Sequence, residues 1–352
     1  MIAFASLNTT WFALIGLLWA GYFLLEGFDF GVAILAPVVS RDETDRRICL
    51  NAIGPFWDGN EVWLIVAGGA TFAAFPLWYA RLFSGFYLAL FIVLVALIAR
   101  GVSFEFRGKD PRSAWRRGFD AANFLGSAIP AIVWGVAFTD LVHGLPLDPT
   151  GRYGGGLVGL LHPVALLGGV VSLALFGLHG ALFLALKTSD ALAERARRAA
   201  LGCGVLALVS LAGLISWLGA APRPPVVGEV AGSVPLGLAL SALLGVALAL
   251  LAVRRGRAGW AFALTGAAIV VLVGAVFARM FPAVLPASNV AAHGVSIGQA
   301  ASQHSTLVVM SVVAAIFTPV VLAYQAWTYW IFRKRLTRPV MPPAAAPGAL
   351  TS

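Results

Sequence analysis

The sequence predicts an all-α polytopic membrane protein, and three observations support this fold class. Hydrophobic residues make up 60% of the 352 residues and charged residues only 11%, less than half the charged fraction of ordinary soluble domains. The mean hydropathy is +0.90. Apolar segments of about 20 residues, the length that crosses a bilayer as a helix, recur along the chain. A soluble core could not bury this much apolar surface.

Nine segments are long enough to span a membrane. The first follows a start, "MIAFASLNTTWF", without a cationic region, so we expect a retained span and not a cleaved signal peptide. The expected spans are 9–36, 50–75, 80–103, 118–140, 157–186, 198–219, 232–253, 258–280 and 304–332. We expect two four-helix bundles (1–140 and 141–281), then an extracytoplasmic loop with a ninth helix (282–332) and a disordered cytoplasmic tail (333–352).

The basic residues predict the orientation. Nineteen of the 24 lysines and arginines lie in the tail and in the loops after the first, third, fifth and seventh spans. Four lie in the alternate loops, and Arg100 lies inside the third span. Because basic loops stay in the cytoplasm, we expect the N-terminus outside and the C-terminus in the cytoplasm. The net charge of +9 then reflects topology and a weak attraction to anionic lipid, not nucleic-acid binding.

Ionisable residues at membrane depth are the candidate functional residues, because charges there are costly and by default indicate function. By their positions in the expected spans, Asp58 lies about 12 Å deep from the cytoplasmic side and Glu61 lies one turn further, near mid-membrane. If the first four helices bundle, six residues of their cytoplasmic halves can line one polar path: Glu26, Asp29, Asp58, Glu61, Arg100 and Asp120.

The chemistry of these residues favours proton transfer. A carboxylic acid at low dielectric can take up and release protons near neutral pH, and Arg100 can hold one carboxylate ionised and in place. Structural ion pairs or snorkelling stay open as alternatives for Arg100 and Asp120, and structural pairing stays open for Glu26 and Asp29. Trp57 and Trp63 flank the acids of the second span. They can contact a quinone or a partner's cofactor, or serve packing alone.

The histidines predict no metal or haem site in this chain. Only His162 and His179 lie well inside an expected span, the same one, where 17 residues separate them by about 25 Å. Haem ligation would favour histidines on facing helices. We therefore expect no cofactor bound by this chain alone.

Several blocks of the sequence resemble subunit II of cytochrome bd-type quinol oxidases. The resemblance covers most of the chain and is strongest over the first four spans, where "WDGNEVWL" (57–64) is highly specific. The matching blocks are "EGFDFGVAIL" (26–35), residues 43–80, "FSGFYLAL" (83–90), Arg100, "GFDAANFLGSAIPAIVWGVAF" (118–138), "GGVVSLALFGLHGA" (168–181) and "MFPAVLPAS" (280–288).

This resemblance implies a role within a complex that oxidises membrane quinol and reduces O₂ to water. Its haems, of the b and d types, belong to subunit I. Subunit II is haem-free with nine spans, supports assembly of the haem site, contributes a proton path from the cytoplasm and can hold a structural quinone. The implied partners are subunit I, a small single-span accessory subunit, quinol and lipid, in the bacterial inner membrane.

The resemblance also bears on single residues. It assigns Asp58 to the proton path, with Trp57 beside it. Glu61 stands where family members carry glutamine, which cannot relay a proton as an acid, so no relay role is implied for Glu61. Three further residues match family positions whose polar character supports the complex: Asp29, Arg100 and Asp120.

Two other hypotheses stay open. A proton-coupled secondary transporter acting alone also uses midplane carboxylates, placed in paired positions of two halves. Here the first half carries nearly all of the intramembrane charge, so no symmetric substrate site is visible. The third hypothesis is a scaffold subunit without a proton role.

Overall fold

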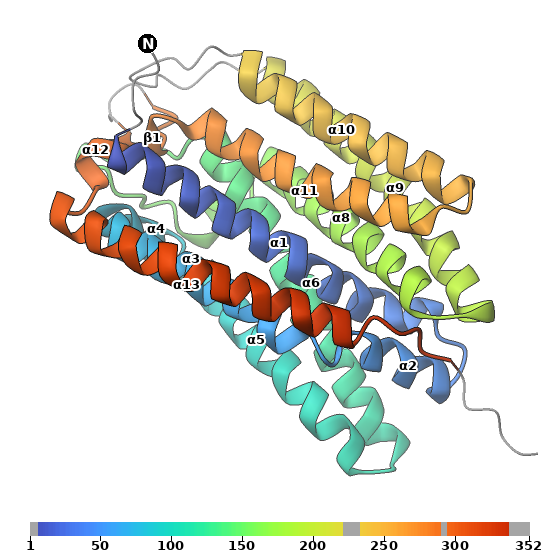
Figure 1. The fold of residues 1–352 in the computed structure, drawn as a ribbon. Helices are drawn as coiled ribbons and strands as arrows, with labels where there is room; N and C mark the ends of the chain where they lie inside the picture. The colour runs from blue at the N-terminus through green and yellow to red at the C-terminus, as the bar shows by residue number, and fades with distance from the viewer. Residues whose placement is uncertain (1–5, 221–232, 290–293, 338–352) are drawn as a thin grey trace, which may run out of the picture.

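The computed structural model describes residues 6–220, 233–289 and 294–337, and its long helices run along one common direction (Figure 1). The elements in chain order are α1 (Leu7–Val39), α2 (Glu43–Ile53), α3 (Trp57–Ala74), α4 (Pro76–Gly85), α5 (Tyr87–Phe106), the 3₁₀-helix η1 (Arg107–Lys109), α6 (Ser113–His143), α7 (Gly156–Leu160), α8 (Pro163–Lys187), α9 (Asp190–Ala220), α10 (Ser233–Arg254), α11 (Ala258–Met280), β1 (Ala283–Leu285), β2 (Val295–Ser296), α12 (Ile297–Ala300) and α13 (His304–Ile331).

Eight helices among the described residues are long and apolar enough to cross a membrane. They are α1, α5 with η1, α6, α8, α9, α10, α11 and α13, and they confirm an all-α polytopic membrane protein. Each corresponds to an expected span, although α1, α6 and α9 begin earlier than expected, and α5 and α8 begin later. Nine spans and the orientation of the termini stay predictions.

The expected second span, 50–75, differs most from the structure. It is divided by a turn at residues 54–56, so its first residues end α2 and the rest form α3. The Gly54–Pro55 pair explains the break, because proline cannot donate a backbone hydrogen bond within a helix and glycine is a poor helix former. The 18 residues of α3 begin with "WDGNE", whose polar groups lower the hydropathy of this segment below that of the eight other helices.

Helix α1 lies in the middle of the molecule and contacts α3, α6, α8 and α11. At its crossing with α8 the two backbones touch: a Cβ atom added to Gly31 would lie 1.9 Å from the Phe176 carbonyl oxygen, and one added to Gly180 would lie 2.4 Å from the Gly31 carbonyl carbon. Only glycine permits this approach. The division into two four-helix bundles stays a prediction, since α1 contacts helices of both halves.

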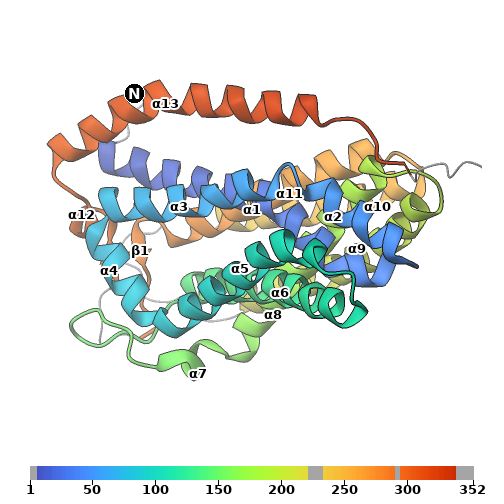
Figure 2. The same cartoon turned by 90° about the horizontal axis from the view of Figure 1, so that it is seen from below.

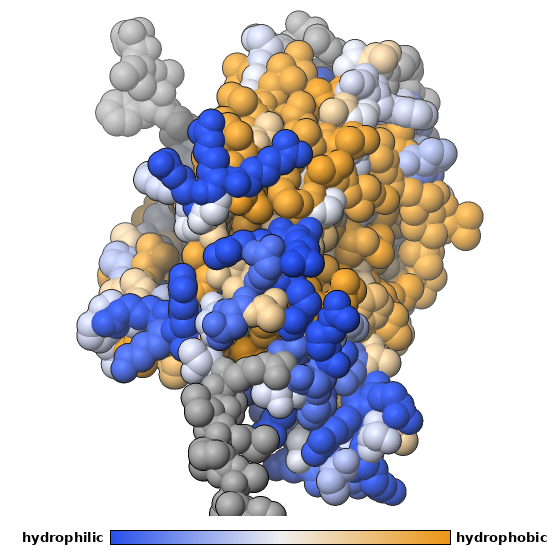
Figure 3. All heavy atoms as spheres, turned by 90° about the vertical axis from the view of Figure 1, so that its right-hand side faces the viewer, coloured by the Kyte–Doolittle hydropathy of each residue, from blue (hydrophilic) through white to orange (hydrophobic). Residues whose placement is uncertain are grey.

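The two ends of the bundle differ in structure. At one end, α4, α7, α12 and the short antiparallel pair β1–β2 cover the helix termini (Figure 2). At the opposite end, hydrophilic residues gather over α2 and the α5–α6 and α8–α9 connections, and an apolar flank rises beside them (Figure 3). This distribution is typical of a protein whose flanks contact lipid or other membrane helices.

The last helix, α13, runs along the outside of the bundle (Figure 2), and only 6% of its apolar window is buried within this chain. The first residues of the expected tail, 333–337, turn back onto α8, where the Leu336 amide donates to the Lys187 carbonyl oxygen at 2.7 Å. The remainder of the tail, 338–352, lies outside the described residues, so its disorder stays a prediction.

Candidate functional site

An arginine and two acids from three helices meet inside the bundle. Arg100 of α5 and Glu26 of α1 are both fully buried, and the Arg100 Nη1 atom forms an ion pair with Glu26 Oε1. The same Nη1 lies 3.4 Å from Oε2 of Glu61 on α3, whose side chain is 22% exposed. The Arg100 guanidinium also lies 4.9 Å from the centre of the Phe30 ring. Arg100 therefore bridges α1 and α3 through one nitrogen.

A hydrogen-bonded amide holds the second acid of α1. Asp29 is fully buried, and its Oδ2 atom accepts a 2.6 Å hydrogen bond from Nδ2 of Asn60 on α3. Oδ1 of Asn60 in turn accepts from Gln325 Nε2 at 2.9 Å and from the Tyr329 hydroxyl at 3.0 Å, both on α13. The helices α1, α3 and α13 thus share one polar network, which is buried at Asp29 and Asn60 and partly exposed at Gln325 and Tyr329.

Asp58 takes a different position from the one expected. Because a new helix begins at Trp57, Asp58 lies in the first turn of α3 and not eight residues inside a span, and its side chain is exposed on the surface of this chain. No hydrogen bond or ion pair joins it to any described residue. It precedes the half-buried Glu61 by one helical turn. The acids of α3 therefore lead from the surface toward the buried Arg100–Glu26 pair.

Asp120 belongs to a separate cluster. Its carboxylate accepts from Arg107 Nε at 2.6 Å and Nη2 at 3.2 Å, and Arg46 lies 3.5 Å away. Arg107 also donates to both carboxylate oxygens of Glu43, each at 2.9 Å. These bonds, above all, hold the pKa of Glu43 below its usual range. The cluster ties α2, η1 and α6 together, so Asp120 does not join the contacts around Arg100.

Two buried polar residues lie between these clusters along the α5–α6 contact. Asn123 Nδ2 of α6 donates to Ser103 Oγ of α5 at 2.9 Å, and this hydroxyl donates to the Arg100 carbonyl oxygen at 2.6 Å. Ser103 and Asn123 are both buried. They keep the segment of α5 that carries Arg100 in register with α6.

The two tryptophans beside the acids are held by contacts within this chain. Trp57 stacks on Phe104 with ring centroids 4.7 Å apart. Trp63 donates from Nε1 to Gln325 Oε1 at 3.4 Å, and its ring fills the space beside Gly21 on α1, where an added Cβ would lie 2.5 Å away. Packing accounts for both side chains, and contact with a quinone or a partner's haem stays a prediction.

The histidines differ in part from the sequence-based expectation. His162 lies outside the membrane-spanning helix, because α8 begins at Pro163 and His162 caps it by accepting from the Ala165 amide. His162 Nε2 lies 2.8 Å from Asp140 Oδ1. His179 is inside α8 as expected, buried, with Nε2 3.2 Å from the Leu24 carbonyl oxygen. Among the residues described, no group of three or more His, Cys, Asp or Glu side chains could hold a metal ion.

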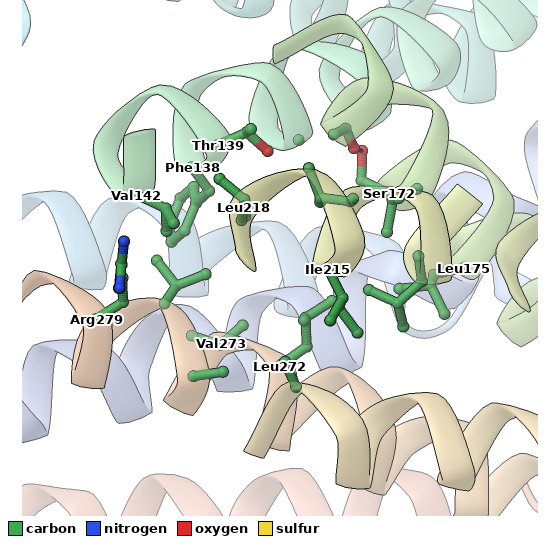
Figure 4. Close-up of a pocket in the computed structure, with 18 of the residues that line it drawn as sticks. Phe138, Thr139, Val142, Ser172, Leu175, Ile215, Leu218, Leu272, Val273 and Arg279 are labelled. Carbon is green, nitrogen blue, oxygen red and sulfur yellow. Dashed lines mark hydrogen bonds between the residues drawn. The ribbon is translucent and has the colours of Figure 1, made fainter. Parts of the chain in front are cut away.

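A cavity lies elsewhere, among α6, α8, α9, α10 and α11, and Phe23 of α1 also lines it. Its volume is about 250 Å³ and its lining is mostly apolar. Arg279 lies at one end, and Thr139 and Ser172 lie along one side (Figure 4). This shape and lining suit an amphiphile with an apolar tail.

Sequence reasoning missed the neutral polar residues of the site. Asn60, Gln325 and Tyr329 carry no charge at neutral pH and were not ranked by depth, although amides are rare in the expected spans that contain them. Arg107 and Glu43 lie outside the expected spans, where a basic–acidic pair is unremarkable. A search for amides inside apolar segments would have found Asn60 and Gln325.

Comparisons with known proteins bear on the family and the fold of this chain. A family model described as cytochrome bd terminal oxidase subunit II matches residues 7–332. Cytochrome bd ubiquinol oxidase subunit 2 of Bacillus subtilis (strain 168) is 39% identical over 336 residues, which cover 95% of this chain and 98% of that protein. Cytochrome bd-I ubiquinol oxidase subunit 2 of Escherichia coli (strain K12) is 38% identical, with 96% and 97% covered.

A solved structure shares the fold. A chain of the bd oxidase from Geobacillus thermodenitrificans superposes with a TM-score of 0.72 at 17% identity, covering 93% of this chain and 97% of that one. At this identity the superposition bears on the fold alone.

Proposed function

The chain belongs to the cytochrome bd terminal oxidase subunit II family, and from this premise we propose that its buried acids carry protons toward the haems of a partner subunit I. As a member of this family it is a subunit of a quinol:oxygen oxidoreductase of the bacterial inner membrane. The proposal concerns what this subunit contributes: a haem-free support for the haem site and a path for protons taken from the cytoplasm.

One observation carries the proposal: acids on α3 and α1 lead from the surface at Asp58, through half-buried Glu61, to the buried Arg100–Glu26 ion pair. Moving charged groups from water into a membrane protein costs free energy, and apolar residues at the same positions would not carry this cost. Acids that persist there suit a task that needs exchangeable protons. Reduction of one O₂ to two waters consumes four protons, and taking them from the cytoplasm moves charge across the membrane.

The surface around Asp58 supports a partner subunit. Ile65 on α3 is 71% exposed and Ile98 on α5 is 57% exposed, so the exposed Asp58 lies beside an apolar flank. We propose that subunit I covers this flank and receives protons there. Its haems would then be shielded from water while the acids of this chain supply protons. A small single-span accessory subunit stays a prediction.

The cavity among α6 and α8 to α11 supports a structural quinone. Its apolar lining suits an isoprenoid tail, and Arg279, Thr139 and Ser172 offer polar groups to a head group (Figure 4). Extraction of the purified complex and mass spectrometry should show bound quinone, in a smaller amount when the cavity is filled. The same amount in a variant with Ala239→Trp, which fills the cavity, would contradict this location.

The central experiment replaces Asp58 by asparagine in the whole complex. We expect quinol-driven oxygen consumption to fall at least tenfold while haem content stays normal, because asparagine keeps the size but cannot exchange a proton. The matched control is Glu194→Gln, an exposed acid of α9, which should leave both quantities unchanged. Normal turnover with normal haem content in the Asp58 variant would favour a scaffold role. Family membership removes the basis for a stand-alone transporter.

A further inference from the structure

A directed chain of hydrogen bonds ends on the buried acid Asp29. Trp63 Nε1 donates to Gln325 Oε1 at 3.4 Å, Gln325 Nε2 donates to Asn60 Oδ1 at 2.9 Å, and Asn60 Nδ2 donates to Asp29 Oδ2 at 2.6 Å. The Tyr329 hydroxyl adds a second donor to Asn60 Oδ1 at 3.0 Å. Every donor in this chain points toward Asp29.

The contacts of Asn60 fix the orientation of its amide. Nδ2 faces two acceptors, Asp29 Oδ2 and the Leu25 carbonyl oxygen at 3.4 Å. Oδ1 faces two donors, from Gln325 and Tyr329. A flipped amide would set its oxygen against two acceptor oxygens and its NH₂ against the Gln325 NH₂ group, so the contacts favour this orientation. Asn60 is fully buried, which leaves no water to compensate for a wrong one.

We propose that Asn60 is a positioning residue that determines which oxygen of Asp29 exchanges a proton, and that α13 holds it in place through Gln325 and Tyr329. This inference rests on the proposed proton path. Because Oδ2 accepts from Asn60, a proton on Asp29 is favoured at Oδ1. That atom is buried and makes no hydrogen bond to any described residue.

The proposal gives a role to Gln325 and Tyr329, which lie on a helix that is barely packed within this chain. Only 6% of the apolar window of α13 is buried, so burial of apolar surface contributes little to fixing it. Gln325 and Tyr329 lie four residues apart and therefore on one helix face, the face that meets Asn60. The position of α13 is thereby linked to the geometry of Asp29.

The test is a double variant on α13, Gln325→Leu with Tyr329→Phe, in the whole oxidase complex. Without these donors the Asn60 amide can turn away from Asp29, and a carboxylate that loses a donor takes up a proton more readily. We expect the pH at which turnover is half-maximal to rise by about one unit, with haem content unchanged. Asn60→Leu, which removes the donor itself, should shift the profile at least as far.

The control is Tyr324→Phe, on the same helix but 64% exposed, which should keep the wild-type profile. The inference would be overturned if the double variant kept the wild-type pH profile of turnover, or if its only change were a lower yield of the complex. Asn60 would then be a structural residue. Should Asn60→Leu fail to assemble, the α13 double variant still decides. Asp58→Asn in the same series separates the two proposals. If turnover of the Asp58 variant falls while the pH profile of the α13 double variant is unshifted, only the positioning role of Asn60 is rejected.

Discussion

At the scale of single residues, Arg100 shows how this chain tolerates charge at membrane depth. Its guanidinium is fully buried, pairs with Glu26 and approaches Glu61. A buried ion pair contributes little net stability, because the loss of hydration offsets the attraction between the charges. Losing one partner is costly, however, because the other charge is left buried and unpaired. The pair is therefore best explained by what it positions, and its stability effects should be strongly non-additive.

This leads to a prediction on stability. Arg100→Met should destabilise the subunit by about 3–5 kcal/mol, because Glu26 remains buried without a counter-ion. The double variant Arg100→Met with Glu26→Gln should recover most of this loss, since neither buried charge remains. The measurement is thermal unfolding of the purified complex, followed through haem absorbance. A double variant as unstable as the single one would show that Arg100 contributes through packing and not through the pair.

At the scale of elements, the break between α2 and α3 decides the position of the acids. A continuous helix over residues 50–75 would have placed Asp58 well inside the membrane. The turn at residues 54–56 instead makes Asp58 part of the first turn of a new helix. Negative charge is favourable at this position, because unpaired backbone N–H groups and the helix dipole make a helix N-terminus electropositive. The same acid is therefore less costly than a midspan carboxylate and remains accessible from the surface.

The crossing of α1 and α8 supplies a prediction on assembly. At Gly180 an added Cβ would lie 2.4 Å from the backbone of Gly31, so Gly180→Ala must push the two helices apart. We expect the free energy of unfolding to fall by about 1–3 kcal/mol or more, and the amount of the chain in the membrane to fall with it. Because α1 carries Glu26 and Asp29, the displacement should also reduce turnover per assembled complex.

The control for this prediction is Gly202→Ala on α9, where nothing lies within 4 Å of the added Cβ. Alanine is the better helix former, so this variant should be neutral or slightly more stable. The amounts of both variants in membranes can be compared by immunoblotting with a common tag. Equal amounts of the two variants would show that the α1–α8 crossing can expand without cost.

At the scale of the whole molecule, the sequence predicted the fold class and eight of the helices because hydropathy is a property of segments. It could not predict the break at residues 54–56 from hydropathy alone, since Gly54 and Pro55 sit within an otherwise continuous window. It also grouped Asp120 with the other acids by depth. Depth along a helix does not say which neighbour a side chain faces, and Arg107, only 13 residues before Asp120, takes that carboxylate.

The same reason explains which parts of the candidate site were found. Glu26, Asp29 and Arg100 were identified because a charge inside an apolar segment stands out in a single sequence. Asn60 and Gln325 were not, because the importance of a neutral amide depends on what its two ends contact. Those contacts join residues 265 positions apart, a separation that local patterns cannot bridge.

The orientation in the membrane is the last prediction, and the proposed direction of proton flow depends on it. The uneven distribution of lysine and arginine predicts that the α5–α6 connection is cytoplasmic and the α6–α7 connection extracytoplasmic. Single cysteines at Gly108 and Thr150, both exposed, test this after Cys49 and Cys203 are replaced by alanine. A membrane-impermeant thiol reagent should label Thr150→Cys in spheroplasts, and Gly108→Cys only after the membrane is opened with detergent. The reverse pattern would place Asp58 and its neighbours on the extracytoplasmic side. Protons would then enter this subunit from the extracytoplasmic side, and the proposed uptake from the cytoplasm would be wrong.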